Sequence, residues 1–271
     1  MPLQVIELAD AVEARARAAT FLTARPVEHN LLLTILEQSI EHSLGGTFWL
    51  VVDGSDVVGF ALQSPPGMGA VLAPMDVGVC HLLAESITIP LWRAVGDAAT
   101  AAAFAGRFSE CASSAVKDIH GQRLYKLDRV ASAVTTPGSL RLATPADRPT
   151  LIEWARAFVE ELELVPENSE AVVDQRIERQ QLWVWDHNGP VSMASASIPA
   201  AGVTRVQHVY TPLKLRGNGF ATACVEGMSR EQLARGLRCV LYTDLGNPTS
   251  NAIYRRIGYE AVAEILGYQF G

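Results

Sequence analysis

The sequence predicts a mixed α/β fold in which one structural unit occurs twice along the chain. Residues 48–66, "FWLVVDGSDVVGFALQSPP", are typical of a β-hairpin with a turn at 53–56. Residues 182–199, "LWVWDHNGPVSMASASIP", have the same pattern, and Asn188-Gly189 favours a tight two-residue turn. An offset of 133 residues relates Asp53 to Asp186 and also lays "AVLAPM" from Ala70 over "VTRVQH" from Val203. A repeated α/β layer is therefore expected.

The boundary between the two copies is expected near residue 135. Residues 129–149, "RVASAVTTPGSLRLATPADRP", are small and polar and contain Pro137 and Gly138, a composition typical of a linker before a new first strand. The sequence thus predicts one domain at 1–134 and a second at 135–271.

The second copy is predicted element by element. A strand at 139–143 is followed by a helix that Thr144 caps, with Pro145 at its first position, running to about Glu163. Hydrophobic patterning and turn residues then predict a helix at 169–180, the second hairpin, a strand at 204–210, a helix at 219–235, a strand at 239–243, a helix at 248–257 and a β segment at 259–270.

Composition narrows the class of protein. The chain has 271 residues, 49% apolar and 19% charged, with a net charge of −7, so no basic surface is expected for a nucleic acid. The first residues are charged and no run of 18 apolar residues occurs, so we expect no membrane segment and a cytoplasmic location. Cys80, Cys111, Cys224 and Cys239 show no metal-binding spacing and are expected to be reduced and mostly buried, without metal.

A glycine-rich stretch, "VYTPLKLRGNGFATA" at 209–223, lies where a strand passes into a helix. The first turn of a helix has free N–H groups and the positive end of the helix dipole. Gly217 and Gly219 remove side chains that would hold a ligand away, and Arg216 adds a mobile positive charge. This turn is typical of a phosphate site, although the R-x-x-G-x-A spacing alone also arises by chance.

A second group of polar residues follows in "NPTSNAIYRRIGY", residues 247–259. Asn247 is expected to cap a helix that starts at Pro248. Asn251 and Tyr254 lie three residues apart on one face, while Ile253 and Ile257 share another. The alternative is an ordinary core tyrosine whose hydroxyl binds a backbone carbonyl.

Together these motifs resemble the GNAT superfamily of acyl-CoA-dependent N-acyltransferases, over residues 139–271. The resemblance implies two GNAT-like domains in tandem, each a mixed, mostly antiparallel twisted sheet flanked by helices. It also implies acetyl-CoA as cosubstrate and Tyr254 as the proton donor to the thioester sulfur. Further coenzyme contacts are implied for the free backbone of Val209, Tyr210 and Thr211, for the turn residues Arg216, Gly217, Asn218, Gly219, Phe220, Ala221 and Thr222, and for Asn247, Asn251 and Tyr254.

The general base and the acceptor pocket are not determined by the sequence. His208 titrates in a useful range, and the alternative to a base is a packed or hydrogen-bonded strand histidine. The glutamates at 160, 161 and 163 are either a solvated helix end or a group that attracts a cationic substrate. Trp183 and Trp185 share one strand face, either as core residues or as part of the acceptor pocket.

The first copy lacks the coenzyme motif. At the ungapped offset of 133, the turn positions become Leu83, Ser86 and Thr88, and the Asn251 and Tyr254 positions become Asp118 and Gly121. The first domain is therefore expected to be a degenerate copy that serves packing and forms one wall of the acceptor cleft.

The expected function is transfer of an acetyl group to a primary amine by direct attack, with a small molecule favoured as acceptor. Net acidity agrees with a cationic acceptor. The alternatives are acetylation of peptide or protein amines, a non-catalytic acyl-CoA-binding regulatory module, and a structural domain with an empty glycine turn. The oligomeric state cannot be read from the sequence.

Overall fold

The computed structural model describes residues 2–131, 135–162 and 168–271. The chain forms two compact units. Unit 1 contains Met1–Tyr125, Tyr242–Asn247 and Ala261–Gly271, and unit 2 contains Lys126–Leu241 and Pro248–Glu260. No helix among the described residues is long and apolar enough to cross a bilayer.

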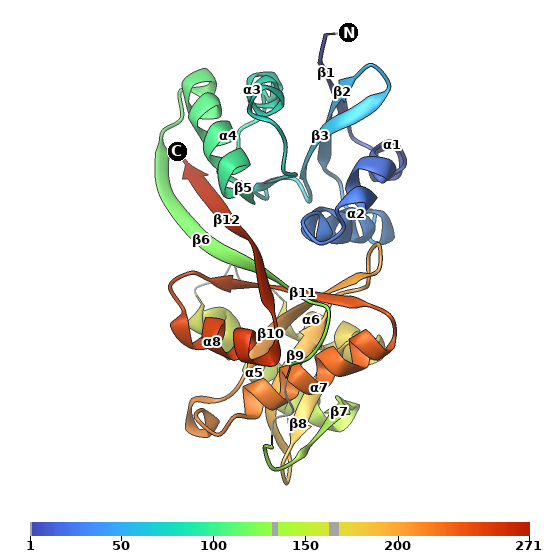
Figure 1. Ribbon diagram of the computed structural model, residues 1–271, viewed down its shortest axis with the longest axis vertical. Helices are drawn as coiled ribbons and strands as arrows, with labels where there is room; N and C mark the ends of the chain where they lie inside the picture. Colours follow the sequence, from blue (N-terminus) through green and yellow to red (C-terminus); the bar gives the residue numbers. More distant parts are fainter. Residues whose placement is uncertain (1, 132–134, 163–167) are drawn as a thin grey trace. The chain divides into compact units, whose positions relative to one another are not determined.

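Unit 1 begins with a strand and two helices, followed by a sheet with two further helices (Figure 1). Its elements from the first half of the chain are β1 (Gln4–Leu8), α1 (Ala11–Ala24), α2 (Asn30–Glu41), β2 (Thr47–Asp53), β3 (Asp56–Gln63), β4 (Ala70–Leu72), α3 (Val77–Ser86), β5 (Arg93–Asp97), α4 (Ala98–Ala112) and β6 (Val116–Leu127).

The sheet of unit 1 is mostly antiparallel. β1, β2, β3 and β4 pair antiparallel in that order, and β4 pairs parallel with β5. The predicted hairpin is confirmed, with Asp53 opposite Asp56 across a two-residue turn. The next partner of β5 is β12 (Glu260–Phe270), the last strand of the chain, which runs antiparallel to it. The sheet of unit 1 is thus completed from the other end of the sequence.

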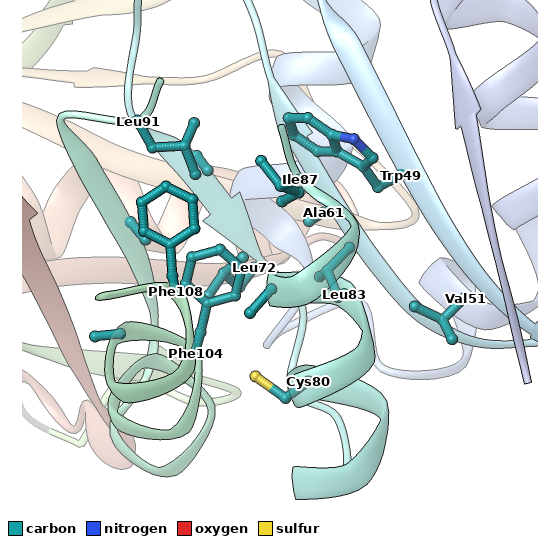
Figure 2. Close-up of a cluster of buried hydrophobic side chains, with 14 of the residues drawn as sticks. Trp49, Val51, Ala61, Leu72, Cys80, Leu83, Ile87, Leu91, Phe104 and Phe108 are labelled. Carbon is teal, nitrogen blue, oxygen red and sulfur yellow. The ribbon is translucent and has the colours of Figure 1, made fainter. Parts of the chain in front are cut away.

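The core of unit 1 packs α3 and α4 against this sheet (Figure 2). Trp49, Leu83, Phe104 and Phe108 are at most 1% exposed, because apolar residues recur at helical and strand spacing. Phe270 of β12 belongs to the same cluster, with its ring centroid 5.0 Å from that of Phe108. The C-terminal strand β12 therefore contributes both backbone pairing and a core side chain to unit 1.

Unit 2 has an equivalent order of elements. They are β7 (Ser139–Leu142), a 3₁₀ turn η1 (Pro145–Asp147), α5 (Arg148–Glu161), α6 (Ser169–Glu178), β8 (Leu182–Asp186), β9 (Pro190–Ala196), β10 (Val203–Tyr210), a 3₁₀ turn η2 (Leu213–Leu215), α7 (Phe220–Ala234), β11 (Arg238–Asp244) and α8 (Pro248–Ile257).

The strands of unit 2 follow the order β7, β8, β9, β10, β11, antiparallel except for the parallel β10–β11 pair. α5 and α7 both pack on β10. The predicted two-residue turn of the second hairpin is wrong: three residues, His187, Asn188 and Gly189, connect β8 to β9. The ladder shifts register between Trp185 and Asp186, and this irregularity lengthens the loop.

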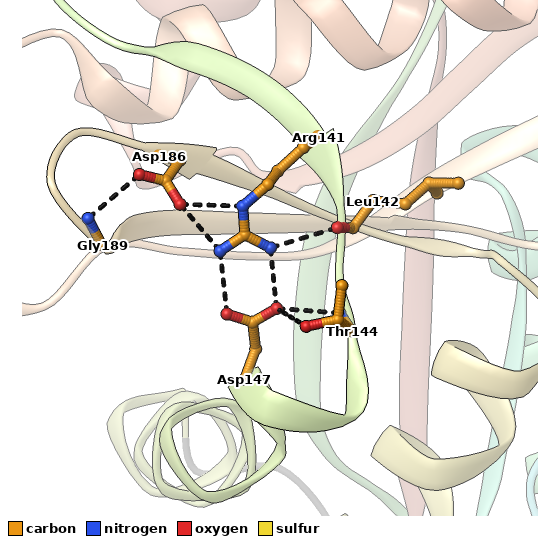
Figure 3. A network of polar contacts seen from close by, with 6 residues as sticks. All are labelled: Arg141, Leu142, Thr144, Asp147, Asp186 and Gly189. Carbon is orange, nitrogen blue, oxygen red and sulfur yellow. Dashed lines mark hydrogen bonds and ion pairs between the residues drawn. The ribbon is translucent and has the colours of Figure 1, made fainter.

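The start of α5 is organised by one buried carboxylate (Figure 3). Asp147 accepts hydrogen bonds from the Thr144 N–H and hydroxyl, both at 2.8 Å, and binds Arg141 through both carboxylate oxygens. Arg141 also binds Asp186 at the end of β8. Thr144 is thus a capping residue as expected, but a 3₁₀ turn precedes α5. The expected helix end at Glu163 lies outside the described residues.

The compact units differ from the division at residue 134, because the segments Tyr242–Asn247 and Ala261–Gly271 belong to unit 1. The boundary itself adjoins residues 132–134, outside the described part of the chain, and stays a prediction. Cys80, Cys224 and Cys239 are buried, Cys111 is exposed, and all four are free thiols. Burial raises the pKa of Cys224 and of Cys239 to about 12, so these thiols stay protonated.

Candidate active site

β10 has an edge that loses its neighbour halfway along. It pairs with β11 only from Val203 to Arg205, opposite Arg238 to Val240, whereas its pairing with β9 continues to Tyr210. The pairing of β10 with β11 thus ends at Arg205, five residues before its pairing with β9 ends. Free N–H and C=O groups on a strand edge can pair with an extended ligand.

The same part of β10 contains a bulge. Gln207 lies opposite Ser195 and Tyr210 opposite Met193, so β10 has one residue more than β9 between these pairs. His208 lies within the bulge with φ of +50°, which is uncommon for a side chain other than glycine. Bulges turn backbone groups away from the regular ladder and occur often beside active sites.

Two serines on β9 hold the backbone on both sides of the bulge, and both are fully buried. The Ser195 hydroxyl donates to the Gln207 carbonyl at 3.0 Å. The Ser192 hydroxyl donates to the Tyr210 carbonyl at 3.1 Å and lies 2.9 Å from the Thr211 hydroxyl. Hydrogen bonds from β9 side chains to these two carbonyls therefore stabilise the bulge.

The end of β10 is joined to the glycine stretch by Arg216. Its Nε donates to the Thr211 carbonyl at 2.8 Å and its Nη2 binds a carboxylate oxygen of Glu161. The guanidinium carbon lies 5.7 Å from the centroid of the Tyr210 ring, and the Tyr210 hydroxyl donates to Glu161 at 3.0 Å. Arg216 therefore has three partners in this structure: the Thr211 carbonyl, the Glu161 carboxylate and the Tyr210 ring.

The turn before α7 keeps its amides uncapped. Gly217 and Gly219 have φ of +83° and +79°, the left-handed region that favours glycine. No side chain caps the helix at Gly219, so the N–H groups of Phe220, Ala221 and Thr222 lack helical acceptors. The exposed Asn218 side chain donates instead to the Leu215 carbonyl at 3.0 Å.

The two glycines are required for different reasons. A Cβ at Gly217 would meet no protein atom within 4 Å, whereas one at Gly219 would lie 2.9 Å from the Thr136 hydroxyl oxygen. Gly219 therefore makes room for the protein's own segment before β7. The turn as a whole is an anion-binding geometry at a helix N-terminus.

Asn251 and Tyr254 face inward from α8, at 5% and 9% exposure. Ile257 is buried on the same side of α8 as Asn251 and Tyr254, and Ile253 is half-buried. The prediction that Asn251 and Tyr254 form a polar face apart from the two isoleucines is therefore wrong. The Tyr254 ring packs edge-on to Tyr259, with centroids 5.9 Å apart. Burial raises the pKa of Tyr254 to about 12, so the phenol is protonated at neutral pH.

Comparison with known proteins agrees with this geometry. Residues 187–266, which include the glycine turn and α8, match the family model described as "FR47-like protein", a GNAT-type domain. Among solved structures, the chain is similar to an acetyltransferase from the GNAT family of Colwellia psychrerythraea, at 13% identity with 100% of both chains covered and a TM-score of 0.63. This chain has the GNAT fold.

Two further structures resemble it over 98% of both chains. A Drosophila protein has 15% identity and a TM-score of 0.68. A tandem GNAT protein from the clavulanic acid biosynthesis pathway, solved without acetyl-CoA, has 13% identity and a TM-score of 0.54. At such identities the likeness establishes the fold alone. No curated protein matches the chain in sequence.

Within the GNAT fold of unit 2, the predicted coenzyme residues fall into three groups. The backbone of Val209, Tyr210 and Thr211 and the turn residues are joined through Arg216, as described above. Tyr254 contacts Tyr259, whose hydroxyl lies 2.9 Å from that of Ser229 in the second half of α7. Asn247 belongs to unit 1. The coenzyme roles of all these residues, the strand and turn residues included, stay predictions.

The other residues considered for the base and the acceptor pocket, His208, Trp183 and Trp185, make contacts within the protein. The His208 ring packs on Phe158 of α5, with centroids 5.2 Å apart, and its Nδ1 lies 3.5 Å from the Ser195 hydroxyl. Its role as base stays a prediction. The indole N–H groups of Trp183 and Trp185 donate to Glu231 at 2.7 Å and to the Pro137 carbonyl at 2.9 Å. The tryptophans are buried core residues.

Unit 1 has the GNAT order of elements but not the site. The offset between equivalent elements rises from 133 at the hairpins to 143 at the helix starts (220 − 77), so the ungapped alignment to Leu83, Ser86 and Thr88 is wrong. Those residues lie in or after α3, and the expected partners Asp118 and Gly121 lie on β6.

The true counterpart of the glycine turn is short and acidic. Residues 73–76 connect β4 to α3, whereas residues 211–219 connect β10 to α7. Asp76 directly precedes α3, and its carboxylate would repel a phosphate. The counterpart of α8 is α4, offset by 150 residues (248 − 98), which has Phe104 at the Tyr254 position. A cavity beside β4 and β5, lined by Leu32, Leu72 and Asp97 among others, has a volume of about 30 Å³, which is room for no more than a few water molecules.

Sequence reasoning missed Ser192, Ser195, Thr136 and the partner role of Glu161. Alternating small residues in "PVSMASAS" were a signal for polar groups on a buried strand, but their targets depend on the register with β10. In the described part of the chain, no group of three His, Cys, Asp or Glu side chains is placed to hold a metal ion.

Proposed function

We propose that the chain is an acyl-CoA-dependent N-acetyltransferase that moves an acetyl group from acetyl-CoA to a primary amine, with its site in unit 2. The observation that carries the proposal is that β10 continues beyond the end of its pairing with β11 and is followed by an uncapped helix N-terminus. The edge suits the amide-containing pantetheine arm, and the turn suits the diphosphate. Both are needed to bind one extended thioester.

Three features of the turn support the proposal that it binds a diphosphate. Uncapped N–H groups of Phe220, Ala221 and Thr222 point out of the helix start. The space above Gly217 is clear of protein atoms within 4 Å of a Cβ. Arg216 uses its Nε and Nη2 in the protein contacts, so a phosphate oxygen that binds the guanidinium either takes Nη1 or replaces one of these partners.

The chemistry assigned to this site is direct transfer. The amine nitrogen forms a bond to the acetyl carbon, a backbone N–H near Val209 or Thr211 on the β10 edge stabilises the developing oxyanion, and the C–S bond breaks. Tyr254 donates its proton to the departing sulfur and is reprotonated from solvent. The ammonium proton leaves to His208 or to a water molecule.

The raised pKa of Tyr254 has two consequences for this role. The phenol is almost fully protonated at neutral pH, as a general acid must be. It is also a weaker acid than a free phenol, which lowers the driving force for proton transfer to the departing sulfur.

A small-molecule amine is the proposed acceptor, and a peptide or protein amine is the alternative. The proposed location is cytoplasmic, without nucleic-acid or membrane partners. The charge of Glu161, which could have attracted a cationic acceptor, is engaged by Arg216 in the structure. A non-catalytic acyl-CoA-binding module is the alternative from another functional class, and a buried phenol with no catalytic use would suit it.

The test uses the full-length chain in two steps. Calorimetry with CoA and with pantetheine, which lacks the diphosphate and nucleotide, measures whether the turn contributes to binding; we expect CoA to bind at least about tenfold tighter. Release of free thiol from acetyl-CoA is then followed with a panel of primary amines. Binding without thiol release on any amine would favour the regulatory module, and absence of CoA binding would refute the coenzyme site.

A further inference from the structure

Glu161, the last residue of α5, lies at the junction of the two halves of the proposed site. One of its carboxylate oxygens accepts from the Tyr210 hydroxyl on β10 at 3.0 Å, and the other binds Nη2 of Arg216 before the glycine turn. The pantetheine-pairing strand and the diphosphate turn are thus held by the same carboxylate.

The position of this ion pair suggests competition with an anionic ligand. Arg216 is two residues from Asn218 and three from the helix start at Gly219, and its side chain is 43% exposed. A diphosphate bound at the α7 amides would bring its negative charges within reach of the guanidinium. Glu161, at 35% exposure, adds one negative charge that opposes this and engages an Arg216 donor.

The magnitude of the pair indicates that a ligand can displace it. Exposed ion pairs contribute little free energy, because solvent screens them and both side chains lose rotamer freedom. Charge-assisted hydrogen bonds from arginine to phosphate are stronger than neutral ones and are often bidentate. Replacement of the Glu161 carboxylate by a diphosphate on Arg216 is therefore favourable. The free energy gained is smaller by the contribution of the ion pair that is lost.

We propose that Glu161 is an affinity-determining residue of the coenzyme site, which lowers coenzyme affinity by competing with the diphosphate for Arg216. The inference rests on the proposed function, since it requires a diphosphate ligand at the turn. In the free protein the carboxylate keeps Arg216 on Tyr210 and Thr211. In the complex Arg216 turns its donors to the phosphate, and Glu161 retains the Tyr210 hydroxyl.

The test is a double-mutant cycle on the full-length chain with CoA as the calorimetric ligand. Glu161→Gln removes the charge but keeps the length of the side chain and a hydrogen-bonding partner for Tyr210. We expect it to bind CoA about two- to fivefold tighter, the range set by an exposed ion pair. In an Arg216→Gln background, which itself binds CoA more weakly, we expect Glu161→Gln to have almost no effect.

Glu170→Gln is the matched control. Glu170 is a half-exposed glutamate of α6 in the same unit, paired with Arg156 of α5. Glu170→Gln removes the same charge but does not alter a contact of Arg216, so this variant should bind CoA with the affinity of the wild type. Thermal melts of the four variants and the wild type establish that each variant is folded.

Each outcome bears on the inference. Unchanged or weaker CoA binding by Glu161→Gln would mean that Glu161 orients Arg216 for the ligand or has no part in binding, and would overturn the competition. Equal tightening in the Arg216→Gln background would show direct repulsion of the ligand by Glu161, without Arg216, and would also overturn it. If wild-type protein binds no CoA, the proposed function itself fails and the inference fails with it.

Discussion

The coenzyme site is tested most sharply by two glycines at opposite ends of α7. Gly217 precedes the helix and Gly236 follows it, with φ of +83° and +78°, and an added Cβ at either would meet no protein atom within 4 Å. Alanine at each position should therefore cost the same, about 1–2 kcal/mol of unfolding free energy, because only the left-handed backbone conformation is penalised.

The two substitutions differ only in what lies outside the protein. If the diphosphate approaches the turn, the Cβ of Gly217→Ala stands in its path and CoA affinity falls at least about tenfold, or 1.4 kcal/mol, whereas Gly236→Ala binds CoA as the wild type does. Urea denaturation measures the first quantity and calorimetry the second. Equal CoA affinities of the two variants would refute the placement of the diphosphate over Gly217.

Gly219 is a poorer probe of the same question. A side chain there would collide with Thr136, so Gly219→Val would disturb the protein whether or not a ligand binds. Loss of CoA binding by that variant could not be assigned to the ligand.

Three further predictions concern other parts of the chain. Tyr254→Phe should lower turnover at least about tenfold and leave CoA affinity unchanged; normal turnover in a thiol-release assay would remove Tyr254 as the acid. Arg141 lowers the pKa of Asp147 to about 2 from 3.8, so its ionised form stabilises the fold above about pH 4 and this contribution disappears as the pH falls to 2. Asp147→Asn should lower the free energy of unfolding by about 2 kcal/mol at pH 7. If urea denaturation shows the same difference between variant and wild type at pH 2, the ionised carboxylate is not its cause. Phe270→Ala should cost about 3–5 kcal/mol although residue 270 is at the far end of the sequence, because it packs on Phe108; a loss below about 1 kcal/mol in denaturation would disprove that packing.

Local structure was largely predictable from the sequence. The helix at 248–257 has the predicted bounds, since Pro248 starts it and Gly258 ends it. The strands at β7 and β10 agree to within a residue. Both hairpins are present, but the loop of the second has one residue more than Asn-Gly predicts, because the register shift depends on the partner strand.

The candidate site was predictable as a set of residues but not as an arrangement. R-x-x-G-x-A and the preceding strand indicated the turn. The contact between Arg216 and Glu161 was not predicted, because the two residues lie 55 positions apart and sequence spacing does not indicate such a contact. Gly219 was attributed to a ligand, whereas Thr136 of the segment before β7 occupies the space beside it.

The sequence by itself determined which segments of the second copy are helices and strands, that the unit occurs twice, and that only the second copy has the glycine turn. These properties follow from residue periodicity and local backbone preference, which act within a few neighbours along the chain. Only the tertiary structure decided that β12 completes the sheet of unit 1, that β10 bulges at His208 and that Glu161 holds Arg216. A strand's partner and a side chain's counter-ion are chosen by packing between distant segments, and this choice has no signature in local sequence.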